Sequence, residues 1–383
     1  MAEDVHALRA LLSARVPPAI AELRAYAPDA SVVPVRLDAN EAPPLLPTLT
    51  PDERAVFRAA LDAIEPARYP DVRAGALRAA LCTRLGVEPS QLVIGCGSDE
   101  VIAMLLATLG QPIGGEPACV VVPSPSFVMY RISARVHGLE VVEVPLDARC
   151  DLDEGAMLDA MRRRRPAVVF LATPNNPTSR AYDLGKVERL VEAAAKLDPP
   201  TVVVIDEAYL PFRLGGDDPW GGTTGLDLLR TAPHMVVLRT LSKIGLAGLR
   251  VGWAIAHPLL AEQLEKVRLP YDVPSLSQAG ALAALGPLSI AIDRHVARIV
   301  AERARLVGSL ARIAGVSHPR ADANFVWLSL PEGRAAFDVA AALKADGVLV
   351  RAFPAHAGKL RVTVGSEHHD DRFLSSLQAA LLP

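Results

Sequence analysis

Short apolar runs rich in β-branched residues alternate with longer segments of helical period between about residues 90 and 256. Runs that are apolar at nearly every position, separated by amphipathic helices, are typical of a parallel sheet covered on both faces. The pattern therefore predicts an α/β fold whose core is a mostly parallel, seven-stranded sheet between helices. The predicted strands are residues 91–94, 118–122, 141–144, 167–172, 201–205, 235–238 and 251–256.

The remaining pattern predicts how the chain is divided into domains. Residues 98–109 and 183–197 begin with Ser98 and Asp183, which are good helix caps. Residues 258–313 are helical in pattern almost throughout, and the alternating charges over 294–313 suit a long connecting helix. Beyond Gly315 we expect a small α+β domain, with strands at 324–330, 348–350 and 359–364, a helix at 334–345 and a closing helix.

The N-terminal segment differs from the rest, because residues 1–50 contain seven prolines and little periodic pattern. We expect it to be an extended arm, or part of the small domain, that can wrap a neighbouring subunit. The predicted domains are thus the arm or part of the small domain at 1–50, a large domain at 51–290 and a small domain at 291–383.

Composition and charge narrow the function classes. The chain is 51% hydrophobic and 22% charged, as expected for a folded domain, and its net charge of −3 gives no field that favours nucleic acid or an anionic membrane. The four cysteines form no CxxC pair, and we see neither a signal peptide nor an apolar run of 18 residues. We therefore expect a cytoplasmic protein without a structural metal, a membrane or a nucleic-acid partner.

The chemistry is expected where predicted strands end, because open α/β sheets bind ligands at the carboxyl edge. The strand at 201–205 delivers Asp206 to that edge, where it is a helix cap, a magnesium ligand together with Glu207, or a cofactor ligand. The magnesium alternative needs the GxxxxGK[ST] loop of nucleotide hydrolases, which the sequence lacks.

Three further motifs follow predicted strands. Lys243 lies among small residues, and an amine desolvated in that setting becomes a nucleophile toward carbonyls. The glycine turn before Ser98 opens a helix, which makes it a phosphate site, although it lacks the third glycine of a dinucleotide fingerprint. Asn176, in the motif Asn-Asn-Pro, can hydrogen-bond a ring substituent. A cofactor with a single phosphate fits these motifs better than NAD.

Together these motifs resemble the fold-type I aminotransferases of class I and II, over essentially the whole chain from Leu37-Asp-Ala-Asn-Glu to Leu360-Arg-Val-Thr-Val-Gly. The resemblance implies that pyridoxal 5'-phosphate is the cofactor, that Lys243 carries it covalently and that Asp206 pairs with its ring nitrogen. The catalytic set would be Lys243, Asp206 and Tyr209. The cofactor would also contact Ser98, Asp99, Phe127, Asn176, Tyr209, Thr240, Ser242 and Arg250, with Tyr69 reaching its phosphate from the partner of a homodimer.

Within the family, Arg68-Tyr-Pro-Asp and Arg239-Thr-Leu-Ser-Lys look most like the histidinol-phosphate aminotransferases. That resemblance implies histidinol phosphate as amino donor, and 2-oxoglutarate and glutamate as the oxoacid pair. Arg361 and Arg351 would hold the substrate anion, and Asn40 and Tyr69 would complete the substrate site. An aromatic or broad-range amino-acid aminotransferase and a threonine-phosphate decarboxylase-like lyase are the alternatives.

Three residues depart from the family pattern. Ser179 stands where most members have glycine, and Phe127 where tyrosine is common. Arg250 follows Lys243 by seven positions, where many relatives have eight.

Overall fold

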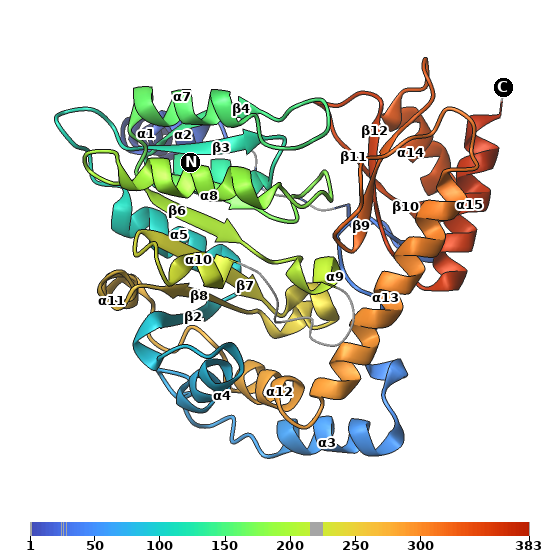
Figure 1. The fold of residues 1–383 in the computed structure, drawn as a ribbon, viewed down its shortest axis with the longest axis horizontal. Coiled ribbons are helices and arrows are strands. Elements are labelled where there is room, and N and C mark those ends of the chain that lie inside the picture. Colours follow the sequence, from blue (N-terminus) through green and yellow to red (C-terminus); the bar gives the residue numbers. More distant parts are fainter. Residues whose placement is uncertain (1, 24, 26, 28, 215–224, 383) are drawn as a thin grey trace.

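The computed structural model describes residues 2–23, 25, 27, 29–214 and 225–382. Its centre is a seven-stranded sheet with the order β2-β8-β7-β6-β5-β3-β4 (Figure 1). Only β8 runs antiparallel to its neighbours, so the other six strands share one direction. The strands are β2 (Leu92–Cys96), β3 (Cys119–Ser124), β4 (Glu140–Pro145), β5 (Val168–Ala172), β6 (Val202–Asp206), β7 (Met235–Thr240) and β8 (Val251–Ala256).

Alternate residues of the central strands are buried on opposite faces of the sheet, which explains their continuous apolar character. Val204 and Phe170 pack beneath α5 (Ser98–Leu109), α6 (Val128–Val136) and α11 (Pro258–Val267). Val203 and Leu171 belong to the opposite core, which is covered by helices including α7 (Glu154–Arg164) and α8 (Leu184–Ala195). The sheet therefore lies between two helical layers.

The C-terminal part of the chain forms a second, smaller unit beside the carboxyl edge of the sheet (Figure 1). Its three-stranded antiparallel sheet has the order β11-β12-β9, and β10 pairs in parallel with the N-terminal strand β1. The long helix α13 (Ser289–Leu310) connects it to the large unit. Its elements are β1 (Val35–Arg36), β9 (Phe325–Ser329), α14 (Ala336–Ala345), β10 (Val348–Leu349), β11 (Arg351–Ala352), β12 (Lys359–Thr363) and α15 (Glu367–Leu381).

Three further helices complete the large unit. They are α3 (Pro51–Asp62), α4 (Gly75–Leu85) and α12 (Ser275–Leu285). Helix α3 begins at a capping box in which Thr50 and Glu53 exchange side-chain and backbone hydrogen bonds. Two short helices, α9 (Leu210–Leu214) and α10 (Gly225–Leu229), flank residues outside the described part of the chain.

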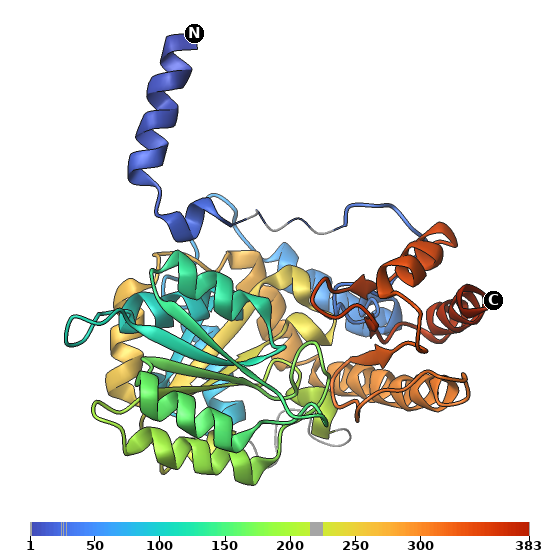
Figure 2. The same cartoon turned by 90° about the horizontal axis from the view of Figure 1, so that it is seen from above.

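The predicted seven-stranded α/β core is confirmed, since each of the seven runs forms a strand of one sheet. The prediction of an extended arm is wrong over its first part. Residues Ala2–Arg15 form helix α1 and Pro18–Ala21 form α2, and α1 stands away from the body (Figure 2). Arm residues 24, 26 and 28 lie outside the described residues. The prolines begin at position 17, so they do not interrupt a helix over the first fifteen residues.

In the described part of the chain, no single helix combines the length and apolar character needed to cross a membrane. Helices α12 and α13 reach that threshold only as a pair, and the chain bends by 80° between them.

His295 is a buried residue of α13, and its protonation tests whether the connecting helix stays packed as the pH falls. Burial lowers its pKa from 6.5 to about 4, and the neighbouring Arg298 acts in the same direction. The unfolded chain therefore binds the proton more tightly than the folded protein, so stability present above pH 6.5 is lost as the pH falls toward 4. As the pH falls from 6.5 to 4, His295 should lower the unfolding free energy of the unaltered protein by on the order of 3 kcal/mol. His295→Gln should not show this decrease.

Urea unfolding at a series of pH values measures this difference. Identical pH slopes for the two proteins would show that His295 does not exclude the proton when folded.

Candidate active site

The carboxyl edge of the large sheet borders a cavity with about 480 Å³ of empty space, part of which is open to solvent. It lies where strands β2, β3, β5, β6 and β7 end, so residues far apart in the sequence meet there. The ten residues that were expected to contact the cofactor from the same subunit all line this cavity, together with three that the sequence did not predict. The lining consists of Ser98, Asp99, Phe127, Tyr130, Ala172, Asn176, Asp206, Ala208, Tyr209, Thr240, Ser242, Lys243 and Arg250.

Asp206 is a buried carboxylate at the end of β6. Its Oδ2 accepts a hydrogen bond of 2.7 Å from the Tyr130 hydroxyl, and its Oδ1 accepts one of 2.9 Å from the backbone N–H of Ala208. Desolvation raises its pKa, while both hydrogen bonds and the charge of Lys243 act to lower it. The carboxylate is thus held in a fixed orientation by two donors, and a cation placed beside it would be strongly favoured.

The opposite end of the cavity is built from closely packed backbone. Gly97 has φ +84°, and a Cβ there would lie 2.4 Å from Nη2 of Arg250, while a Cβ on Gly252 would lie 2.3 Å from the backbone nitrogen of Ser98. Gly252 is therefore required for the two backbones to pass each other, and Gly97 suits its positive φ. The result brings the first turn of α5 against the Arg250 guanidinium, an arrangement that favours a bound anion.

Two hydroxyl groups join this anion-binding end. The Thr240 and Ser242 hydroxyl oxygens are 2.9 Å apart, and Nη1 of Arg250 lies 3.4 Å from the Ser242 hydroxyl. Nη2 of Arg250 also pairs with Asp99 at 3.6 Å. Although Arg250 follows Lys243 by seven positions instead of eight, its guanidinium still lies at this anion-binding end. The Arg250 backbone is in the left-handed region, with φ +50°.

Lys243 lines the same cavity, with its Nζ 5.6 Å from the centre of the Tyr209 ring. The Tyr209 hydroxyl accepts a hydrogen bond of 2.9 Å from the Asn40 side-chain amide, which ties the N-terminal segment to the cavity. Asn40 is in turn fixed by a hydrogen bond of 3.0 Å from its backbone nitrogen to the hydroxyl of Thr363 in β12. The predicted substrate residue Asn40 is therefore buried next to the cavity wall.

Arg361 comes from β12 of the small unit and reaches the same place. Its Nη1 donates to Oδ1 of Asn176 at 2.7 Å, and its Nη2 donates to the backbone oxygen of Asp38 at 2.5 Å. Arg351 in β11 is directly paired with Arg361 across the antiparallel ladder. Opposite residues in such a ladder point to the same face of the sheet, so the two guanidinium groups share one face.

Tyr69 does not line this cavity. It is 81% exposed, and its ring stacks on that of Tyr271 with the ring centres 4.6 Å apart. Its predicted role depends on a partner subunit and stays a prediction.

Tyr130 is the residue of chemical interest that sequence reasoning missed. It lies in α6, three positions after the N-cap residue Phe127, and the Phe127 and Tyr130 rings meet edge to face at 5.5 Å. That helical spacing between two aromatic residues was the available signal.

The residues present fit pyridoxal 5'-phosphate. The anion-binding end suits a phosphate, the buried Asp206 suits a protonated ring nitrogen, and Phe127 offers an aromatic ring between them. Within the described residues, the hydroxyls of Thr240 and Ser242 and the guanidinium of Arg250 supply donors of the kind that a phosphate needs at this end. The same part of the chain contains no group of three His, Cys, Asp or Glu side chains that could hold a metal ion.

The sequence model of the family described as aminotransferase class I and II matches residues 34–377. The chain therefore belongs to the class I and II aminotransferases and is a pyridoxal-phosphate-dependent aminotransferase. This confirms the resemblance, fold class and cofactor expected from the sequence.

More particular relatives are histidinol-phosphate aminotransferases. The protein of that name from Paracidovorax citrulli is 38% identical, with 96% of this chain and 97% of that protein covered. The one from Methylibium petroleiphilum is 39% identical, with coverage of 94% and 93%. The crystal structure of the Sinorhizobium meliloti histidinol-phosphate aminotransferase with pyridoxal-5'-phosphate shares the fold, with a TM-score of 0.81, 24% identity and coverage of 96% and 97%.

Tyr130→Phe tests how Asp206 is controlled. Removing the hydroxyl takes away a hydrogen bond to a charged group, so the pKa of Asp206 should rise further and cofactor affinity should fall by roughly tenfold to a hundredfold. The acid limb of cofactor binding should move to higher pH, because the carboxylate is protonated sooner. Absorbance titrations of the cofactor-free protein across pH measure both effects.

Tyr182→Phe is the matched control, since Tyr182 is also buried but does not line the cavity. An unshifted acid limb in Tyr130→Phe would contradict the role assigned to the hydroxyl.

Proposed function

We propose that this protein transfers the amino group of histidinol phosphate to 2-oxoglutarate, giving imidazole-acetol phosphate and glutamate. We also propose that it works in the cytoplasm as a homodimer, in which the exposed Tyr69 of one subunit reaches the phosphate end of its partner's cavity. The full-length similarity to proteins named histidinol-phosphate aminotransferase supports this substrate over those of other branches of the family.

The observation that carries the substrate assignment is the pairing of Arg351 with Arg361 on one face of the small sheet. A carboxylate is satisfied by one bidentate arginine, whereas a phosphate ester carries up to two charges and three acceptor oxygens. Arg361 hydrogen-bonds the cavity residue Asn176, so Arg351 on the same face of the sheet would add a second guanidinium for a phosphate dianion.

Each end of the cavity has a defined task in holding the cofactor. Ser98, Thr240, Ser242 and Arg250 would bind its phosphate, and Asn176 and Tyr209 would donate hydrogen bonds to its ring hydroxyl oxygen. Asp206 would place a negative charge against the ring nitrogen and so keep it protonated. Bound in this way, pyridoxal phosphate supplies an electron sink for the charge that develops when a proton leaves the substrate.

Lys243 has two tasks in this proposal. Its amine would hold the cofactor, and as a free amine it would take the proton from the substrate Cα as a general base. Arg361 and Arg351 meanwhile fix the far end of the substrate and so direct its Cα toward Lys243.

Replacing Lys243 with Ala tests the central assignment. The variant should lose turnover by several orders of magnitude, since both the covalent attachment and the general base are removed. It should also lack the visible absorbance of covalently held cofactor while the fold, followed by circular dichroism, is retained. Turnover close to that of the unaltered protein would refute the assignment.

Arg351→Gln tests the choice of substrate. Loss of a charge-assisted contact should lower kcat/KM for histidinol phosphate by roughly tenfold to a hundredfold, and should affect phenylalanine much less. Arg334→Gln is the control, because Arg334 binds the backbone oxygens of Leu381 and Leu382 instead. Equal losses for both amino donors would argue against a phosphate site at Arg351.

The two alternatives have separate signatures in the unaltered protein. Faster reaction with phenylalanine than with histidinol phosphate would indicate an aromatic aminotransferase. Release of carbon dioxide from a phosphorylated amino acid, without an oxoacid acceptor, would indicate a decarboxylase.

A further inference from the structure

Ser179 occupies an unusual position between the two units of the chain. It is completely buried, and its φ of +63° lies in the left-handed region, where a side chain is disfavoured and glycine is the usual residue. A serine at such a place carries a conformational cost, so its hydroxyl is expected to make contacts that offset the cost.

The hydroxyl of Ser179 makes two hydrogen bonds to the small unit. It donates to the backbone oxygen of Phe325 at 2.6 Å and accepts from the backbone nitrogen of Ala323 at 3.0 Å. The backbone oxygen of Ser179 accepts a third hydrogen bond of 2.9 Å, from the nitrogen of Asp322. One residue of the large unit therefore holds the segment that leads into β9.

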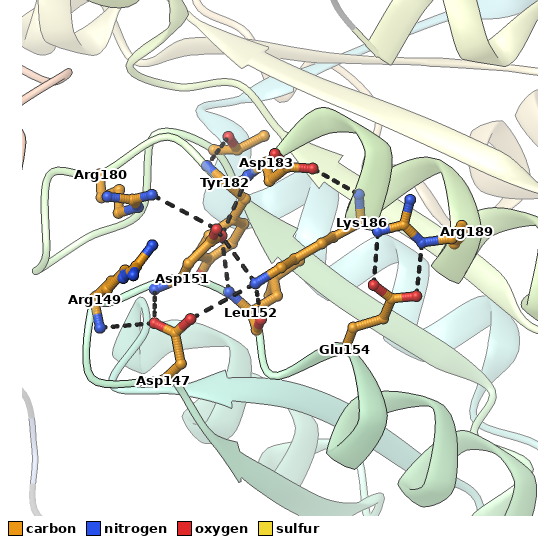
Figure 3. Close-up of polar contacts among 11 residues, drawn as sticks. Asp147, Arg149, Asp151, Leu152, Glu154, Arg180, Tyr182, Asp183, Lys186 and Arg189 are labelled. Atoms are coloured by element: carbon orange, nitrogen blue, oxygen red, sulfur yellow. Dashed lines mark hydrogen bonds and ion pairs between the residues drawn. The ribbon is translucent and has the colours of Figure 1, made fainter.

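Ser179 belongs to a loop that hydrogen bonds and ion pairs attach to the large unit. Its backbone nitrogen donates to the oxygen of Asn175 at 2.7 Å, next to the cavity residue Asn176. Further along the loop, Arg180 pairs with the buried Asp151 at 3.7 Å, and the nitrogen of Asp183 donates to Oδ1 of Asp151 at 3.2 Å (Figure 3). Lys186 also lies 3.4 Å from the Asp151 carboxylate (Figure 3). The loop is thus anchored to the large unit from behind.

Phe325 links the contact of Ser179 to the substrate end of the cavity. Its ring meets the Tyr209 ring edge to face at 5.0 Å, and the guanidinium carbon of Arg361 lies 5.6 Å from its centre. Strand β9, which begins at Phe325, pairs along its length with β12, which carries Arg361. A shift of Phe325 would therefore displace Arg361 relative to Asn176.

We propose that Ser179 is a positioning residue that sets β9 and β12 against the cofactor loop and so places Arg361 for anionic substrates. The inference rests on the proposed role of Arg361 in substrate binding. It assigns Ser179 no contact with cofactor or substrate, because its effect passes through the Phe325 backbone.

The test compares Ser179→Gly with Ser179→Ala. Glycine removes the hydroxyl and suits a positive φ, whereas alanine removes the hydroxyl but keeps the disfavoured Cβ. Three quantities are measured: hydrogen exchange of the Ala323 amide, KM and kcat for the amino donor and the oxoacid, and the Kd of cofactor-loaded protein for maleate, a non-reacting dicarboxylate.

Both variants should exchange the Ala323 amide faster, because its acceptor is gone. KM for both substrates and the Kd for maleate should rise by at least about threefold, with kcat and the cofactor Kd within about twofold of the original values. Arg361→Lys provides the reference for a direct loss of anion binding.

Faster exchange with unchanged KM and maleate Kd would overturn the proposal, as would a change confined to Ser179→Ala, which would point to backbone strain. A parallel fall in kcat and in cofactor affinity would show a general loss of structure and would also overturn it. If Arg361→Lys leaves maleate binding unchanged, the role of Arg361 in the proposed function has failed, whereas the exchange data still report whether Ser179 holds β9.

Discussion

Asp206 is a carboxylate buried at the carboxyl end of a central strand, and much of the site is arranged around it. A buried charge is costly unless hydrogen bonds or an opposite charge compensate it. Tyr130 and the Ala208 backbone supply two donors, but desolvation still raises the pKa of Asp206. The cavity is therefore suited to a cation at this point, which is what the ring nitrogen of pyridoxal phosphate provides when it is protonated.

The opposite end of the cavity has the complementary charge, and it depends on close approach of backbone. Gly97 and Gly252 allow β8 to pass under the first turn of α5, so that Arg250 reaches the Thr240–Ser242 hydroxyl pair. The negative charge at Asp206 and the positive charge at Arg250 would thus orient a ligand that carries a cationic ring and an anionic phosphate.

The sequence predicted the fold and this cavity well, because both depend on local patterns. Each strand is a continuous apolar run, and each cavity motif directly follows a strand, so the parallel sheet brings them to one edge. Tyr130 was missed because it lies within a helix, where an aromatic residue usually belongs to the core, as its stacking on Phe170 shows that it partly does. Helix α1 was not predicted because the proline content of residues 1–50 was taken as one value, although every proline in that segment lies at position 17 or later.

The contacts between the two units could not be predicted, since no local pattern encodes them. Ser179 was visible only as a departure from glycine, and nothing in its neighbourhood indicates that Phe325 and Ala323 lie opposite, 144 and more positions away. Arg361 reaches Asn176 from β12, which pairs with β9 in the other unit of the chain. The proposed cofactor residues of one subunit lie at the edge of the large sheet, whereas the proposed anion-binding residue Arg361 lies across the junction, so a residue that adjusts the junction would change substrate affinity without changing the chemistry at Lys243.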